Sequence, residues 1–269
     1  MGLLALADKT TAILRRDLLT AIRYRSSFLI NVGGAAVELA AFYYLAHAVG
    51  PTFHPDGVEY FPFLVVGTGF YTFLVMGIHS FVQTIQEAQS SGTLEILLTT
   101  STPAPTLVFL SAMSSFAASA AQFLFYVGAG LLLYRDAVPA PNLVGCFIIF
   151  LLSLAIAVAL GIIAAAVQLS IQRGSAVLWL LGSGTWFMTG TLFPVTTLPK
   201  PLQAISALIP ITHSLDAMRL ALLQGVSLTA LGREISILLL CAGTLLPASL
   251  LTFAYSLKSA KRHGTLSFY

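Results

Sequence analysis

Residues 143–169 read LVGCFIIFLLSLAIAVALGIIAAAVQL, and no side chain in this stretch carries a charge. A helix needs about 20 apolar residues to cross the hydrocarbon core of a bilayer, so the stretch predicts a membrane-spanning helix. Backbone polar groups in lipid must be satisfied within the segment, and the alternating pattern of a membrane barrel is absent, which favours α-helices throughout. The six stretches that meet these criteria are Ser27–Ala48, Phe61–Ile85, Thr106–Leu133, Leu143–Leu169, Ser175–Phe193 and Glu234–Leu257.

The composition of the whole chain agrees with this class. Of its 269 residues, 57% are hydrophobic and 9% are charged, and the mean hydropathy is +0.91. Soluble domains carry roughly 25% charged residues, so the sequence predicts an all-α integral membrane protein made of one transmembrane domain. The basic residues gather at the two ends of the chain and form no patch, which excludes a nucleic-acid partner.

The Lys and Arg residues of the flanks predict the orientation, because cytoplasmic flanks carry the excess of positive charge. Six spans place both termini and the segment 86–104 on the same side of the membrane. That side holds nine basic residues and the opposite side four, so both termini are predicted to be cytoplasmic. The nine are Lys9, Arg15, Arg16, Arg23, Arg25, Arg173, Lys258, Lys261 and Arg262; the four are Arg135, Lys200, Arg219 and Arg233.

Three segments outside the spans have a character of their own. Residues 1–26 form a basic amphipathic stretch, typical of an interfacial helix that serves either as a docking surface or as a simple anchor. Residues 86–104 are a polar interruption between two long apolar runs. Residues 194–233 are broken by four prolines, which predicts short re-entrant or outer helices at 202–208 and 212–223. The spans occupy 27–85, 105–193 and 234–257, and a cytoplasmic tail follows at 258–269.

The chain lacks the residues of a nucleotide or metal site. No Gly-Lys pair occurs, so a Walker A loop is absent and any ATP site must belong to another polypeptide. Cys146 and Cys241 fall inside apolar runs without metal-ligand spacing. His213, Asp216 and Arg219 follow one another at three-residue steps, which indicates an interfacial polar stripe rather than a hydrolytic centre. We therefore expect no catalytic residue, no metal and no cofactor bound by this chain.

Glu38 is the only carboxylate deep inside a predicted span. A charge there costs at least a few kcal/mol, so its side chain must face protein or water, be paired, or be protonated. It lies either on a substrate or coupling route or in a structural hydrogen bond to a neighbouring helix. Aromatic and methionine side chains in the second and fifth spans suit an apolar cavity for an amphipathic ligand. The candidates for the substrate path are Glu38, Phe70, Phe73, Met76, Trp186 and Phe187.

Taken together, these features resemble the permease subunit of a type-2 ABC exporter, a member of the ABC-2 family. Glu87 followed by Gly92-Thr93-Leu94-Glu95 is similar to the family's acidic E-x-G-T-L-E coupling segment. Phe193-Pro194, Leu198-Pro199 and the run from Ile209 to Arg219 resemble its F-P … L-P … N-P-L-T-Y … D-A-L-R pattern. The general plan of the resemblance covers nearly the whole chain, whereas the motifs cover only a small part.

Two positions depart from the family pattern. Ala88 to Ser91 stand where family members often carry charged residues, which leaves fewer charges for docking and shifts the contact toward helix shape and apolar side chains. Ile209 replaces the common Asn before Pro210.

The resemblance implies that Glu87 to Thr100 forms a coupling helix seated in a groove of a separate cytoplasmic ATPase, where ATP and Mg would bind. Two ATPases and two permeases, identical or different, would form the transporter in a bacterial plasma membrane, with the substrate path between the permeases. The implied coupling residues are Glu87, Gly92, Thr93, Leu94, Glu95, Leu97 and Leu98; the implied outer gate consists of Phe193, Pro194, Pro210, His213, Asp216 and Arg219.

The function that the resemblance implies is export of a hydrophobic or amphipathic compound, either drug-like or a lipid. An alternative within the family is export of a lipid-linked polysaccharide. An alternative from another class is an ion-coupled secondary transporter, which usually shows inverted repeats and several intramembrane charges. This chain shows one deep carboxylate and no visible repeat.

Overall fold

The computed structural model of the protein describes residues 25–92, 104–133, 140–171 and 184–263, and all regular structure within these ranges is helical. The prediction of an all-α chain is confirmed for them. The described helices are α2 (Arg25–Val49), η1 (Pro55–Gly57), α3 (Tyr60–Ser90), α5 (Ala104–Leu133), α6 (Leu143–Ile171), α8 (Thr185–Met188), η4 (Val195–Thr197), α9 (Lys200–Ser206), α10 (Pro210–Leu223) and α11 (Gly232–His263).

Within the described ranges, four helices are long and apolar enough to cross a membrane: Val32–Val49, Tyr60–Ser90, Leu143–Ser170 and Gly232–Ala260. They coincide with the predicted first, second, fourth and sixth spans. The predicted third span is α5, whose described apolar part is Ser119–Leu133. Residues 175–183 of the predicted fifth span lie outside the described residues, and its described end is helical only to Met188, because the chain turns at Gly190 with φ 73°. The six-span layout therefore stays a prediction.

Helix α3 is the central element of the bundle. Of its apolar span, 89% is buried inside the protein, against 39% for α6 and 22% for α11. It packs against α5, α6, α10 and α2, while α11 packs along α6. A helix that is apolar all round must be enclosed by other helices or by lipid, and α3 is enclosed by helices.

Aromatic side chains of α3 pack against aromatic side chains of α5 and α6. The ring of Phe73 stacks on Phe150 of α6 with a centroid distance of 4.9 Å and lies edge-on to Phe116 of α5 at 6.1 Å. Gly77 of α3 faces the Phe116 ring so closely that a Cβ atom there would collide with it. The glycine therefore lets the ring reach the backbone of α3 and brings the two helices together.

The segment between α8 and α11 forms short helices, as the prolines predicted. Helix α9 carries Pro201 in its first turn and α10 begins at Pro210, positions where proline costs no hydrogen bond and presets the helical φ. The helices predicted at 202–208 and 212–223 are thus confirmed, with slightly earlier starts. Helix α10 packs against α3, α6 and α11, so this helix is part of the core.

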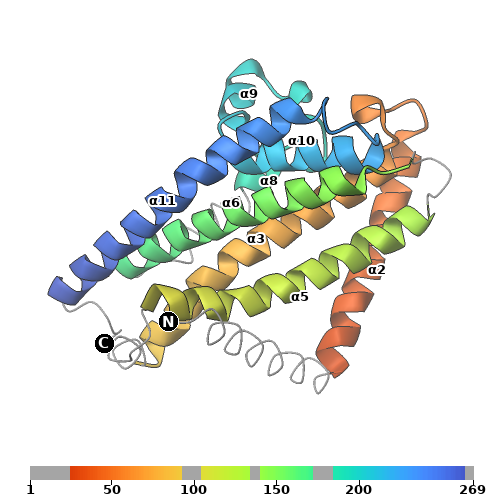
Figure 1. Ribbon diagram of the computed structural model, residues 1–269. Helices are drawn as coiled ribbons and strands as arrows, with labels where there is room; N and C mark the ends of the chain where they lie inside the picture. Colours follow the sequence, from red (N-terminus) through yellow and green to blue (C-terminus); the bar gives the residue numbers. More distant parts are fainter. Residues whose placement is uncertain (1–24, 93–103, 134–139, 172–183, 264–269) are drawn as a thin grey trace.

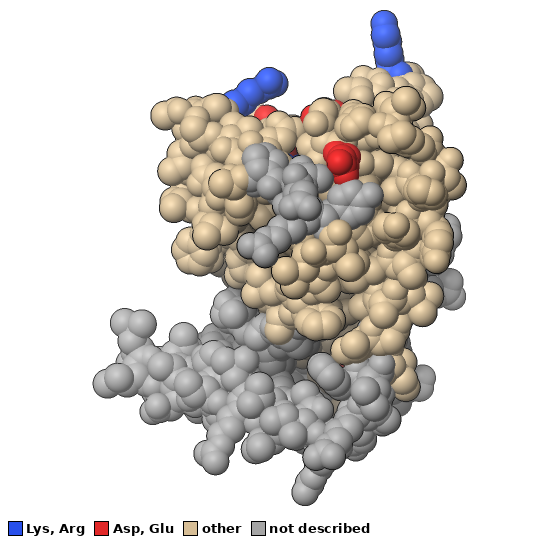
Figure 2. Space-filling view, turned by 90° about the vertical axis from the view of Figure 1, so that its right-hand side faces the viewer, with Lys and Arg blue, Asp and Glu red and all other residues tan. Residues whose placement is uncertain are grey.

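The two ends of the helix bundle are formed by different helix ends. Figure 1 shows the ends of α3, α6 and α11 and the start of α5 at one end, and α9, α10 and the start of α11 at the other. Figure 2 shows that the Lys, Arg, Asp and Glu side chains in view gather near the upper end, above a described flank without charge. This distribution suits a bundle whose flank faces lipid and whose ends face water.

Candidate functional site

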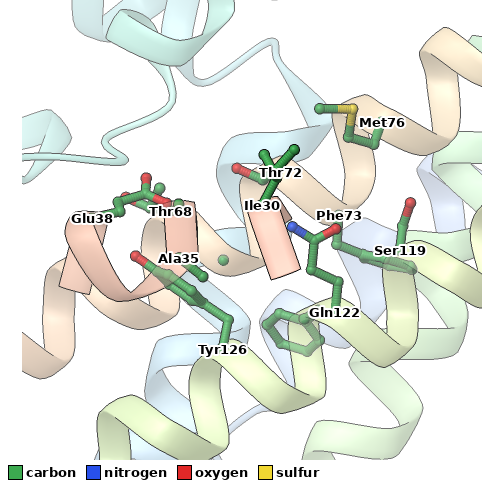
Figure 3. A pocket seen from close by; sticks show the side chains of 13 residues that line it. Ile30, Ala35, Glu38, Thr68, Thr72, Phe73, Met76, Ser119, Gln122 and Tyr126 are labelled. Atoms are coloured by element: carbon green, nitrogen blue, oxygen red, sulfur yellow. The ribbon is translucent and has the colours of Figure 1, made fainter. Parts of the chain in front are cut away.

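A pocket of about 350 Å³ lies between α2, α3 and α5 (Figure 3). Helices α3 and α5 run antiparallel, so the first pocket residues of α3 lie beside the last pocket residues of α5. The pocket combines apolar walls with several polar side chains, and it is within the usual size range of sites for small ligands. Its lining consists of Ile30, Gly34, Ala35 and Glu38 from α2, of Thr68, Gly69, Thr72, Phe73 and Met76 from α3, and of Ser119, Gln122, Phe123 and Tyr126 from α5.

Glu38 is the only charged residue of the lining. It lies near the middle of α2, its side chain is exposed, and it is close enough to Tyr126 for an electrostatic interaction. No hydrogen bond or ion pair joins its carboxylate to another described residue. One prediction for Glu38 was a structural hydrogen bond to a neighbouring helix, and no described residue is the partner of such a bond. The other prediction placed Glu38 on a substrate or coupling route, and its side chain does line a pocket.

The sequence-predicted path residues divide between two places. Phe73 and Met76 line the pocket with Glu38, and Phe70 is fully buried beside Phe73 in the aromatic cluster of α3, α5 and α6. Trp186 and Phe187 instead belong to α8 and do not line the pocket. The structure thus brings three of the six candidates together, and the transport role of all six stays a prediction.

Sequence reasoning missed the contribution of α5 to this pocket. Ser119, Gln122 and Tyr126 are polar residues on one face of a mainly apolar helix, at steps of three and four residues. Thr68 and Thr72 repeat the pattern on α3 at a step of four. Polar residues at helical spacing inside two predicted spans were the signal that could have found these side chains.

The second notable feature is the buried side chain of Arg219 on α10, which is 4% exposed. Its Nη1 donates a hydrogen bond to the carbonyl of Gly190 at 2.9 Å, and its Nη2 donates to the carbonyls of Thr191 at 2.9 Å and Phe63 at 3.2 Å. Its Cζ lies 3.5 Å from the centroid of the Phe63 ring. We call this arrangement the Arg219 clamp, because it joins α10, α3 and the turn at Gly190.

Gly67 of α3 makes room for the Arg219 clamp. A Cβ atom at Gly67 would collide with Nη2 of Arg219 and would lie 2.7 Å from the carbonyl oxygen of Thr191. Only glycine leaves enough space there for a guanidinium group between two backbones.

Charges on α10 affect one another because they are poorly hydrated. Burial raises the pKa of Asp216 to about 6, against a smaller opposing effect of the nearby Arg219. Burial lowers the pKa of Arg219 to about 10, so it is still cationic at neutral pH, with Asp216 and Asp56 acting in the opposite direction. Of the predicted interfacial stripe, Arg219 is buried, whereas His213 and Asp216 are only partly buried.

The other residues of the implied outer gate lie between the turn at Gly190 and Arg219 in the chain. Phe193 packs edge-on against Phe187 with a centroid distance of 5.2 Å, and Pro194 precedes η4. Pro210 begins α10. His213 has Nε2 3.0 Å from the carbonyl oxygen of Ala207 and Nδ1 3.5 Å from the carboxylate of Glu234 on α11. The six residues thus belong to the segment 193–219, and its role as a gate stays a prediction.

The C-terminal end of α3 contains the first residues of the implied coupling segment. Glu87 lies in the last turn of α3, and its carbonyl accepts hydrogen bonds from the hydroxyls of Ser90 at 3.1 Å and Ser91 at 2.6 Å. Gly92 then takes the left-handed conformation, with φ 66°. The expected single helix from Glu87 to Thr100 is therefore interrupted at Ser91 and Gly92. Thr93, Leu94, Glu95, Leu97 and Leu98 lie outside the described residues.

The same end of α3 is joined to α6 through two amides. Nε2 of Gln168 donates to Oε1 of Gln89 at 3.3 Å, and both side chains are buried. This contact fixes the last turn of α3 to the last turn of α6 next to the implied coupling segment.

A family model described as "ABC-2 family transporter protein" matches residues 47–251, well over half of the 269-residue chain. No curated protein matches the chain. The matched range contains α3, α5, α6 and α10, and with them the α3 and α5 walls of the pocket and the whole Arg219 clamp. Glu38 precedes it.

Proposed function

Because the chain belongs to the ABC-2 family of transporter proteins, we propose that it is the permease subunit of an ATP-driven exporter of hydrophobic or amphipathic compounds. The observation that carries the proposal is the family match across residues 47–251. The chain is a membrane transport component and not itself catalytic, so ATP and Mg bind in a separate ATPase subunit. Substrate leaves the cytoplasm or the inner leaflet toward the outside.

The length of α3 supports a coupling role for the segment that follows it. Its 31 residues extend about 46 Å, whereas the hydrocarbon core is about 30 Å thick. The last turns of α3, where Gln83, Gln86 and Glu87 are exposed, therefore protrude from the membrane. An ATPase that binds residues 87–98 moves α3 directly, because this segment continues from the end of α3. It also moves α6, because the Gln89–Gln168 contact joins the two helices.

The position of this end relative to the basic tail supports a cytoplasmic location. Lys258 and Arg262 are exposed near the end of α11, which lies at the same end of the bundle as the end of α3 (Figure 1). Positive charge collects on the cytoplasmic side of membrane proteins. Both termini are then cytoplasmic, in the plasma membrane of a bacterium, and the outer segment with the Arg219 clamp faces the opposite side.

Export requires a route that opens alternately to the two sides. The pocket between α2, α3 and α5 provides a candidate binding site on this route, and the outer segment provides a gate. A single chain supplies half of a transporter, so two permeases, identical or different, assemble with two ATPases.

The test of this function is copurification of the full-length chain with an ATPase. An affinity-tagged chain extracted in mild detergent is expected to recover a protein that carries a Walker A loop and hydrolyses ATP. Glu95→Lys is expected to reduce the recovered ATPase at least about fivefold, because it reverses a charge in the coupling segment. Glu59→Lys, which makes the same change before α3 at the opposite end, serves as the matched control.

Two results would count against the proposal. Equal recovery of the ATPase with Glu95→Lys and Glu59→Lys would refute the assignment of the docking segment. Transport without any nucleotide-binding partner would refute the exporter and would favour an ion-coupled secondary transporter.

A further inference from the structure

The pocket between α2, α3 and α5 has a definite charge. Glu38 is its only ionisable carboxylate, and no Lys, Arg or His is present among its lining residues. No hydrogen bond or ion pair within the described ranges compensates the carboxylate. A charge at this depth in the membrane is stable only when a counter-charge or a polar environment accompanies it, and a ligand can supply the counter-charge.

Two hydroxyl groups beside Glu38 also lack partners. Thr68 and Tyr126 line the pocket and are each 5% exposed. Neither Oγ1 of Thr68 nor the Tyr126 hydroxyl has a hydrogen-bond partner among the described residues. Buried polar side-chain atoms are nearly always hydrogen-bonded, so two orphan hydroxyls at one place indicate a polar group that belongs there.

Figure 3 shows how these groups are arranged: Glu38, Thr68 and Tyr126 lie at one end of the pocket, and Met76 and Ser119 lie toward the other. A carboxylate and two hydroxyl oxygens offer three hydrogen-bond acceptors, which matches the three donors of a primary ammonium group. The ring of Tyr126 also provides a face that attracts a cation.

The remaining walls suit an apolar body attached to that ammonium group. Phe73 and Phe123 contribute aromatic surface, and Met76 contributes a flexible thioether that adapts to different shapes. A neutral ligand offers the Glu38 carboxylate no counter-charge, so the carboxyl group would have to be protonated or hydrated beside it, and an anion would be repelled by the carboxylate.

We propose that this pocket selects protonated primary amines with an apolar body, with the ammonium group held by Glu38, Thr68 and Tyr126. The inference deepens the proposed function by naming the substrate class, and it rests on that function only for the direction of transport. Selection arises because Glu38 attracts a cation and rejects an anion.

The test measures binding of radiolabelled 4-phenylbutylamine to the full-length chain in phosphatidylcholine nanodiscs, with empty nanodiscs as the background. Unlabelled 4-phenylbutylamine is expected to displace the label. The neutral analogue 4-phenylbutan-1-ol and the anion 4-phenylbutanoate, at equal concentration, are not. The trimethylammonium analogue, which has no N–H donors, is expected to compete more weakly than the primary amine.

Variants connect the binding to the three polar groups. Glu38→Gln is expected to weaken binding at least about tenfold, because it removes the counter-charge. Tyr126→Phe is expected to weaken it by about 3- to 10-fold, the effect of one lost hydrogen bond. Glu59→Gln makes the same acid-to-amide change outside the pocket and is expected to change the affinity less than about twofold.

A variant that retains the charge guards against misreading a folding defect. Glu38→Asp is expected to bind the amine better than Glu38→Gln, and both variants must elute as monodisperse protein. Equal affinities of wild type and Glu38→Gln would overturn the proposal. Equal competition by the alcohol, or only non-saturable uptake of the amine, would overturn it as well.

The outcome is separable from that of the ATPase experiment. Glu38-dependent amine binding by a chain that recovers no ATPase would leave the amine site standing and refute the exporter. If the chain recovers an ATPase but its amine binding does not depend on Glu38, the exporter would stand and the amine site would be refuted.

Discussion

Replacing Arg219 by methionine tests the central claim about the outer segment, that the Arg219 clamp holds it on the membrane bundle. The methionine fills a similar apolar volume but removes the three hydrogen bonds to Gly190, Thr191 and Phe63. The turn at Gly190 then loses a buried donor, and its carbonyl oxygens are left without that partner.

The magnitude follows from three contributions. A hydrogen bond from a charged donor contributes about 2 kcal/mol, so three contribute about 6 kcal/mol. Stacking on the Phe63 ring adds about 1 kcal/mol. Burial lowers the pKa of Arg219 from 12.5 to about 10 although Asp216 and Asp56 act in the opposite direction, which corresponds to a net cost of about 3 kcal/mol for keeping the charge, a cost that the methionine avoids. The free energy of unfolding is therefore expected to fall by about 4 kcal/mol.

Thermal unfolding of the detergent-solubilised protein provides the assay. The free thiols of Cys146 and Cys241 are partly buried, so their reaction with a thiol-specific fluorescent dye reports unfolding. A loss of this size is expected to lower the melting temperature by roughly 10 °C. Arg219→Lys retains the charge but not the planar fork of donors, and it is expected to lie about midway between wild type and Arg219→Met.

Arg233→Met is the matched control, because Arg233 is exposed at the start of α11. It is expected to change the free energy of unfolding by no more than about 0.5 kcal/mol. Equal melting temperatures for Arg219→Met and Arg233→Met would refute the clamp.

A substitution on the opposite helix tests the same contact independently. Gly67→Ala drives a Cβ atom into the guanidinium of Arg219 and toward the Thr191 carbonyl, at an expected cost of about 1–3 kcal/mol. Gly128→Ala, at a helical glycine with open space around it, is the control. In the Arg219→Met background the cost of Gly67→Ala is expected to fall, because the guanidinium is no longer there.

Two further predictions concern stability outside the clamp. Asn142→Ala is expected to lower the free energy of unfolding by about 2 kcal/mol. Oδ1 of Asn142 accepts a hydrogen bond from the backbone N–H of Gly145 in the first turn of α6, and Nδ2 donates one to the carbonyl of Val226. An unchanged melting temperature would contradict this prediction. Burial raises the pKa of Asp216 from 3.8 to about 6, so its protonated form favours the folded state. That contribution, up to about 3 kcal/mol, is present below pH 4 and lost as pH rises through 6. Asp216→Asn is expected to reduce the fall in melting temperature between pH 5 and pH 8, and parallel pH profiles of wild type and variant would disprove it.

The helical class and the positions of the four long apolar helices could be predicted because they depend on local rules. A stretch such as Leu143–Leu169 must form a helix in lipid, whatever its neighbours are, since its backbone groups have no other partners. The short outer helices were predictable for the same reason, because Pro201 and Pro210 mark where helices begin. The boundary at Ser91 and Gly92 was not predicted, since the Gly-Thr-Leu-Glu resemblance suggested one continuous helix.

The candidate sites could be predicted only in part. Glu38 was identifiable because a carboxylate inside a span is costly wherever it lies. Its neighbours Thr68 and Tyr126 were not, because they belong to other helices. Arg219 was assigned to an interfacial stripe, since its spacing from His213 and Asp216 says which face of α10 it occupies but not what that face packs against.

By itself the sequence determined an α-helical membrane protein, the extent of its long apolar helices and the residues too polar to face lipid, because the bilayer imposes these features residue by residue. Only the tertiary structure decided that Glu38, Thr68 and Tyr126 share one pocket and that Arg219 bonds to carbonyls 28, 29 and 156 residues away in the chain. The physical reason is the packing of α3. Glycines and hydroxyl side chains occur at fixed positions along α3. Which side chains contact them depends on how α2, α5 and α10 pack against α3.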